Sequence, residues 1–126
     1  MQTAQQRRAK WALEKVEDAR NSGVSRKEYK SYASAFPAMI QMNGLGQAAA
    51  FYRSKGAGKD EKAIAYLSLY ELLSDWLIQS GQPFAGCTDL LAGITSRDMH
   101  AYRLAQAEAL ALLDWVKKFA KAFMED

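Results

Sequence analysis

Apolar residues recur along this chain at intervals of three and four residues, and this spacing limits the possible folds more than any other feature. In the first segment Ala12, Val16 and Ala19 fall on one side of a helix, and Leu112 and Val116 repeat the pattern near the end. Helices repeat every 3.6 residues and strands every two. Because no stretch alternates for long enough to form a strand, the sequence predicts an all-α protein.

Glycines, a proline and capping residues divide the chain into about six helical segments. We expect Gly23 to end the first helix, because glycine readily adopts the left-handed conformation of a C-terminal cap. Ser25 is expected to begin the second helix, with Glu28 completing a capping box. Pro37 is expected to break or kink that helix, because proline disfavours helical geometry at the residue before it.

Residues 43–46 (Asn-Gly-Leu-Gly) interrupt otherwise helical sequence, which indicates a close backbone crossing or a positive φ. Asp60 is predicted to cap the long middle helix, and residues 95–98 to form a capping box for the last helix, which runs to about Met124. Loops are expected at residues 55–59 and 81–86, and a short turn of helix at 89–92. The sequence therefore predicts a compact bundle of about six helices, forming a single domain over residues 1–126.

The charge of the chain permits contact with nucleic acid without requiring it. Lys and Arg number 17 against 14 Asp and Glu, giving a net charge of +3, and 49% hydrophobic residues argue against disorder. The only cysteine, Cys87, cannot form an internal disulfide, which fits a reducing compartment. No apolar run is long enough to span a membrane, and the first residues lack the pattern of a signal peptide. We therefore expect a cytoplasmic protein.

The residues needed for catalysis or metal binding are nearly absent. His100 is the only histidine, so no zinc cluster is predicted, and a Cys87–His100 dyad stays open but disfavoured, because a nucleophile needs a placed base. Residues 56–59 (Gly-Ala-Gly-Lys) imitate the end of a phosphate-binding loop. However, Arg53 stands where its first glycine should be, and Asp60 replaces its Ser or Thr. The sequence predicts neither an enzyme nor a bound cofactor.

Basic residues gather at three places where they could follow a phosphate backbone. They form an arc on the last helix apart from its core face, surround the loop between the middle helices, and occur near the N-terminus. A charge run that simply faces solvent is the alternative explanation. The candidate nucleic-acid contacts are Arg7, Arg8, Arg53, Lys55, Lys59, Arg103, Lys117, Lys118 and Lys121.

Three apolar residues lie away from the expected core faces and are candidates for a subunit interface. Trp11 lies beside cations on the first helix, and Leu104 and Trp115 belong to a second apolar stripe on the last helix. Packing against another helix of the same chain explains these positions most simply. Alternatively, they meet a neighbouring subunit, because tryptophan is enriched in protein interfaces.

Several of these segments together resemble a known family. The matching segments are residues 27–40, 43–51, 54–55, 66–77 and 102–120. Residues 43–51 are the most specific of them. They occur in order over nearly the whole chain. In this respect the sequence is similar to the small helical subunit family of type III-B CRISPR (Cmr) RNA-guided effector complexes.

The resemblance implies a bundle of about six helices without an active site. Members of the family stack with copies of themselves and with other Cmr subunits along the guide–target RNA duplex, in antiviral defence, while another subunit cleaves the target. Guide RNA and target RNA are therefore the expected ligands of the candidate basic residues, with no small-molecule cofactor and no membrane. A helical adaptor that binds only protein is the alternative function that the composition leaves open.

Overall fold

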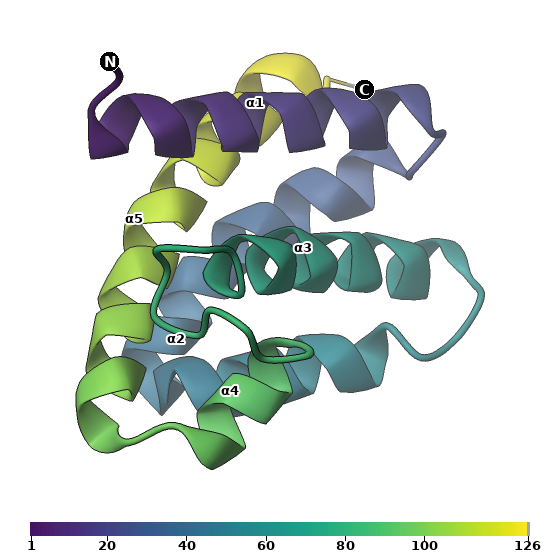
Figure 1. The fold of residues 1–126 in the computed structure, drawn as a ribbon. Helices are drawn as coiled ribbons and strands as arrows, with labels where there is room; N and C mark the ends of the chain where they lie inside the picture. Colours follow the sequence, from purple (N-terminus) through teal and green to yellow (C-terminus); the bar gives the residue numbers. More distant parts are fainter. Residues whose placement is uncertain (126) are drawn as a thin grey trace.

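The computed structural model describes residues 1–125, which form five helices around one core and contain no strand (Figure 1). The helices are α1 (Ala4–Asn21), α2 (Arg26–Lys55), α3 (Glu61–Leu77), α4 (Leu90–Ser96) and α5 (Met99–Phe123). The predicted all-α fold is confirmed. Within the described residues, no helix combines the length and the apolar character needed to cross a membrane.

Aspartate side chains begin three of the helices. Asp60, Asp89 and Asp98 accept hydrogen bonds of 2.8–2.9 Å from amides in the first turns of α3, α4 and α5. The cap predicted at Asp60 is confirmed. The capping box predicted at residues 95–98 is wrong, because Ser96 belongs to α4, where its hydroxyl donates to a carbonyl of the preceding turn. Helix α5 therefore starts later, from Asp98 alone.

The starts of α1 and α2 use hydroxyl side chains. Ser25 caps α2 as predicted and accepts a hydrogen bond of 3.4 Å from the Glu28 amide, but Glu28 does not return the bond that would complete the predicted capping box. A reciprocal capping box lies at α1, which the sequence analysis did not identify. There Thr3 Oγ1 accepts from the Gln6 amide at 3.1 Å, and Gln6 Oε1 accepts from the Thr3 amide at 2.8 Å.

Helix α2 bends sharply at Gly44, which has φ 87° and ψ 160° and is its one non-helical residue. Two side chains of α5 bond the amides that the bend exposes. Leu45 N donates to Gln106 Oε1 at 2.9 Å, and Gly46 N donates to the Tyr102 hydroxyl at 2.8 Å. The interruption predicted at residues 43–46 is confirmed. Since it divides α2 into two segments, the chain has close to the predicted number of helical segments.

Of the two outcomes predicted at Pro37, a break or a kink, the break is wrong. Pro37 lies inside a continuous stretch of α2, and Phe36 before it is helical and fully buried. The ring of Phe36 stacks on Tyr52 with centroids 3.8 Å apart, so the two halves of the bent helix pack against each other. A proline inside a helix costs about 3 kcal/mol. Burial of Phe36 and of Ile40 one turn later offsets that cost.

The core lies between α2, α3 and α5. On α5 the predicted core face is confirmed, with Ala105, Ala109, Leu112, Leu113 and Val116 fully buried. Helix α3 buries residues on most of its sides, because α2, α5, α4 and α1 all contact it. Helix α1 packs mainly across α5 and covers the end of the bundle at which both chain termini lie (Figure 1).

Helix α3 lies so close to Gly56, the residue that caps the end of α2, that a side chain has no room there. A Cβ atom on Gly56 would lie 2.9 Å from the Cα of Leu67, and this backbone atom moves only if α3 moves. We therefore expect Gly56→Ala to lower the free energy of unfolding by about 1–3 kcal/mol, as overpacking does elsewhere. Chemical denaturation followed by circular dichroism measures this loss.

The control is Gly58→Ala, in the same loop. Its added Cβ would meet Ala63 Cβ at 3.4 Å, an ordinary contact, so its stability should change little. Equal stability of the two variants would contradict the close approach at Gly56.

Candidate functional site

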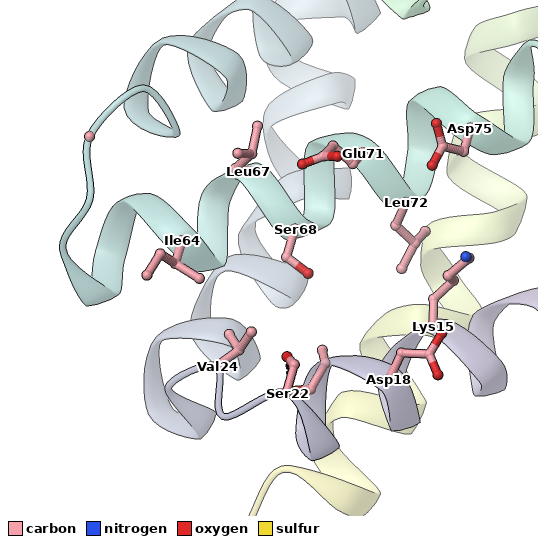
Figure 2. Close-up of a pocket in the computed structure, with 12 residues that line it drawn as sticks. Lys15, Asp18, Ser22, Val24, Ile64, Leu67, Ser68, Glu71, Leu72 and Asp75 are labelled. Atoms are coloured by element: carbon pink, nitrogen blue, oxygen red, sulfur yellow. Dashed lines mark hydrogen bonds between the residues drawn. The ribbon is translucent and has the colours of Figure 1, made fainter.

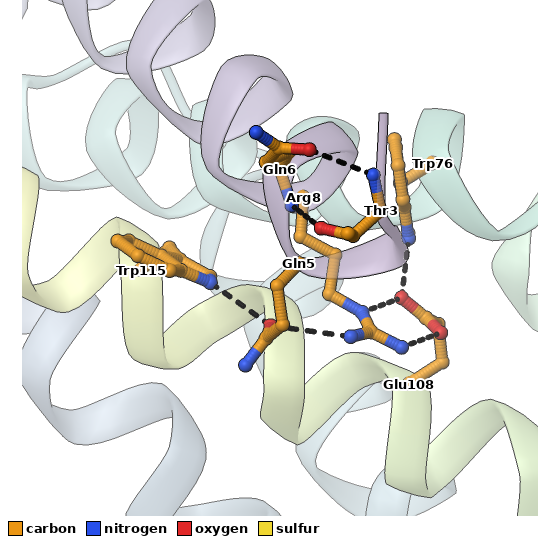
Figure 3. A network of polar contacts seen from close by, with 7 residues as sticks. All are labelled: Thr3, Gln5, Gln6, Arg8, Trp76, Glu108 and Trp115. Carbon is orange, nitrogen blue, oxygen red and sulfur yellow. Dashed lines mark hydrogen bonds and ion pairs between the residues drawn. The ribbon is translucent and has the colours of Figure 1, made fainter. Parts of the chain in front are cut away.

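A network of polar contacts joins α1, α3 and α5, and it includes one of the predicted basic residues (Figure 3). Arg8 binds Glu108 through two hydrogen bonds, Nε to Oε2 at 2.7 Å and Nη2 to Oε1 at 2.9 Å. Trp76 Nε1 donates to the same Oε2 at 2.9 Å. The side chains of Arg8 and Glu108 are only 20% and 15% exposed. The guanidinium of Arg8 is thus engaged within the chain.

The hydrogen bond from Arg8 holds the pKa of the Glu108 carboxyl below its ordinary value of 4.5. The Trp76 indole acts in the same direction, whereas partial burial opposes them. The same hydrogen bond raises the pKa of Arg8. The charged pair is therefore the form that this environment favours near neutral pH.

Two of the three predicted interface residues are half-buried and donate hydrogen bonds within the chain. Trp11 Nε1 donates to the Leu72 carbonyl at 3.1 Å, and its ring lies 5.5 Å from that of Trp76. Trp115 is half-buried, and its Nε1 donates to Gln5 Oε1 on α1 at 3.2 Å (Figure 3). Packing within the chain thus explains both tryptophans. Leu104 is 49% exposed on α5 and keeps its place as an interface candidate.

The first basic surface, here called the loop patch, lies where α2 passes into α3. It consists of Phe51, Arg53, Lys55, Lys59 and Lys62, all of them exposed. The ammonium of Lys55 lies 5.6 Å from the centroid of the Phe51 ring. Within residues 1–125, none of the four cations forms an ion pair. The patch therefore offers cations around an exposed aromatic ring.

The second basic surface, here called the α5 stripe, consists of Arg103, Lys117, Lys118 and Lys121. Lys118 forms an ion pair with Asp114 at 2.7 Å, but both side chains are more than 60% exposed, so the pair is weak. Gln106, which the sequence places on the same arc, turns instead to the bend of α2. The stripe spans about 27 Å, since a helix rises 1.5 Å per residue.

The structure does not bring all the candidate cations together. Figure 1 places the loop after α2 on one side of the molecule and the start of α5 on the other. Arg7, at the start of α1, is exposed and donates to the Gln2 carbonyl at 2.8 Å. The predicted contacts therefore form separate surfaces, and Arg8 belongs to an internal ion pair.

Cys87 and His100, the two side chains considered as a dyad, are not hydrogen-bonded to each other in the described part of the chain. Cys87 Sγ accepts a hydrogen bond of 3.3 Å from Arg97 Nε. A guanidinium cannot serve as a base, because it stays protonated in proteins. His100 is exposed on the first turn of α5. No group of three or more His, Cys, Asp or Glu residues among residues 1–125 could hold a metal ion.

These features define a small all-helical protein that presents charged surfaces around an apolar core. The family model described as CRISPR-associated protein (Cas_Cmr5) matches residues 4–123, and the chain belongs to this family. It is also 30% identical over 126 residues to the CRISPR system Cmr subunit Cmr5 of Thermus thermophilus, with both chains covered completely. The resemblance to the Cmr small-subunit family is thereby confirmed.

The ion pair between Arg8 and Glu108 predicts a pH-dependent contribution to stability. Because the pKa of Glu108 is lowered on folding, its contribution is present above pH 4.5 and is lost as the pH falls through the lowered value. We expect Glu108→Gln to lower the free energy of unfolding at pH 7 by roughly 1.5–3 kcal/mol, as loss of hydrogen bonds to a charged group does. Urea denaturation from pH 7 to pH 3 should show this difference shrinking in acid.

The matched control is Asp114→Asn, which removes the exposed partner of Lys118. This change should cost less than about 0.5 kcal/mol at pH 7, because solvent screens exposed pairs. A loss for Glu108→Gln that is the same at pH 7 and at pH 3 would show that the carboxylate charge does not stabilise the fold.

Proposed function

We propose that the protein is a non-catalytic scaffold subunit of a type III-B CRISPR (Cmr) RNA-guided effector complex in the cytoplasm. In this role it stacks with copies of itself and with other subunits, and it contacts the guide–target RNA duplex. Membership of the Cas_Cmr5 family and the relative named as a Cmr subunit support the assignment to such a complex. The small number of reactive side chains supports the non-catalytic role.

The observation that carries the RNA contact is the excess of cations on the α5 stripe and the loop patch, which are exposed apart from the half-buried Lys117. On the α5 stripe four cations face one nearby carboxylate, that of Asp114. Around the loop patch Asp60 and Glu61 accompany four cations, and Asp60 is already engaged as a helix cap. Exposed cations without carboxylate partners bind phosphates by releasing counterions. This mode reads the backbone and gives no preference among target sequences.

Exposed apolar side chains on the first half of α5 support contact with other subunits. Met99 is 66% exposed and Leu104 is 49% exposed. Apolar side chains are typical of protein interfaces when they lie close together, and Met99 lines one surface hollow with Tyr102, Ala107 and Leu110. They are also the feature that the alternative function, a protein-only adaptor, would use.

We expect removal of positive charge from either basic surface to weaken target RNA binding by the reconstituted complex. The α5 variant replaces Arg103, Lys117 and Lys121 with alanine, and the loop variant replaces Arg53, Lys55 and Lys59. Each phosphate contact adds about −0.7 to −0.9 to the slope of log K against log salt, so each variant should flatten this slope. Filter binding at several salt concentrations, with unrelated target sequences, measures both effects.

A third variant, with alanine at Lys10, Arg20 and Lys27, removes the same charge from exposed positions elsewhere and should leave the slope unchanged. If the α5 and loop variants both behave like this control, neither surface touches RNA and the protein-only adaptor becomes the better explanation. Loss of binding to one target sequence only would indicate base readout in place of backbone contact.

A further inference from the structure

A groove of about 420 Å³ runs between the second half of α1 and helix α3 (Figure 2). Its apolar lining includes Val24, Ile64, Leu67 and Leu72. Ile64 is 47% exposed, although isoleucine is usually buried. Ile64, Leu67 and Leu72 fit an ordinary amphipathic helix in the sequence, so only the structure shows that they border a groove.

The groove stays open because α1 and α3 meet closely only at one end. The contact there is the hydrogen bond from Trp11 to the Leu72 carbonyl, together with the packing of Trp11 on Trp76. From Ile64 to Asp75 the groove follows α3 for roughly 16 Å at 1.5 Å per residue. This length accepts about three turns of another helix lying alongside.

Charges along the groove are mostly negative. Asp18 on α1 and Glu71 and Asp75 on α3 contribute three carboxylates, and Lys15 is the only cation in the lining. Within the described residues none of these carboxylates forms an ion pair. Lys15 lies over the Trp11 ring, 4.5 Å from its centroid. The lining thus carries a net negative charge in a chain whose net charge is +3.

This distribution disfavours RNA as the occupant, because phosphates and the carboxylates of the groove repel one another. An apolar lining with acidic edges instead complements a helix that carries leucine-like residues on one face and lysine or arginine beside them. We propose that the α1–α3 groove is the docking surface for a basic amphipathic helix of another polypeptide. The proposal deepens the scaffold function proposed above, on which it rests, by naming the chemistry of its protein partner.

The test uses a designed probe and the full-length protein. The probe is a 14-residue fluorescent peptide of leucine and lysine, with its leucines spaced to share one helical face. Two control peptides carry glutamate in place of lysine, or the same residues in an order that scatters the leucines. We expect fluorescence anisotropy to show saturable binding of the probe and no binding of either control peptide. The probe should also change the amide NMR shifts of Val24, Ile64 and Leu67.

Two variants test the groove itself. The first combines Asp18→Asn, Glu71→Gln and Asp75→Asn, and we expect it to bind the probe about tenfold more weakly, since three exposed ion pairs are lost. It should fold normally, because it also removes the repulsion between Glu71 and Asp75 on one face of α3. The second is Ile64→Ala, which should weaken probe binding without changing the stability of the protein. Its control is Met42→Ala, at an 82% exposed residue of α2, which should leave probe binding unchanged.

Several outcomes would overturn the proposal. These are absence of probe binding, equal binding of the glutamate peptide, undiminished binding by both groove variants, or shifts confined to α5. If a short RNA shifted the amide signals of the groove, the groove would be assigned to RNA instead. If sedimentation showed a dimer that the groove variants abolish, the groove would be assigned to a second copy of the chain. The groove variants should keep the wild-type salt slope for target RNA binding. An error in the groove proposal and an error in the proposed RNA contact would therefore give different results.

Discussion

The bend of α2 at Gly44 is the constraint on which the rest of the architecture depends. A straight helix of 30 residues would be about 45 Å long, and its two ends could not share a core. The positive φ of Gly44 turns the chain so that Phe36 and Tyr52 stack on each other. Tyr102 and Gln106 then satisfy the amides exposed at the bend, which ties α5 to both halves of α2. The same turn directs the second half of α2 away from α5 and carries the loop patch to the far side of the molecule (Figure 1).

Charge is separated over the surface that this arrangement creates. The α5 stripe and the loop patch together carry eight of the 17 Lys and Arg residues, and the α1–α3 groove carries carboxylates beside apolar side chains. The strongest ion pair, between Arg8 and Glu108, is largely withdrawn from solvent and holds α1 on α5. The proposed RNA and protein contacts therefore use different surfaces of one small domain. Such a division suits a subunit of an assembly, because each contact can form without displacing the other.

Much of the secondary structure could be predicted from the sequence, and the errors have a common cause. The caps at Ser25 and Asp60 and the interruption at residues 43–46 were predicted correctly, because they depend on neighbouring residues. Pro37 was expected to break or kink a helix, yet that helix continues through it and buries Phe36. Among the candidate cations, the pairing of Lys118 with Asp114 one turn away could have been found from spacing. The partner of Arg8 lies 100 positions away in the sequence and could not.

The sequence by itself determined the all-α class, most of the helix boundaries, the core face of α5 and the family to which the chain belongs. Periodicity, capping and characteristic segments are properties of residues that lie close together along the chain, so they can be seen without a structure. Only the tertiary structure decided that Trp11 and Trp115 bond to other parts of the chain, that the candidate cations form separate surfaces, and that an acidic groove opens between α1 and α3. Each of these features joins residues from different helices, and their distances are set by how the helices pack.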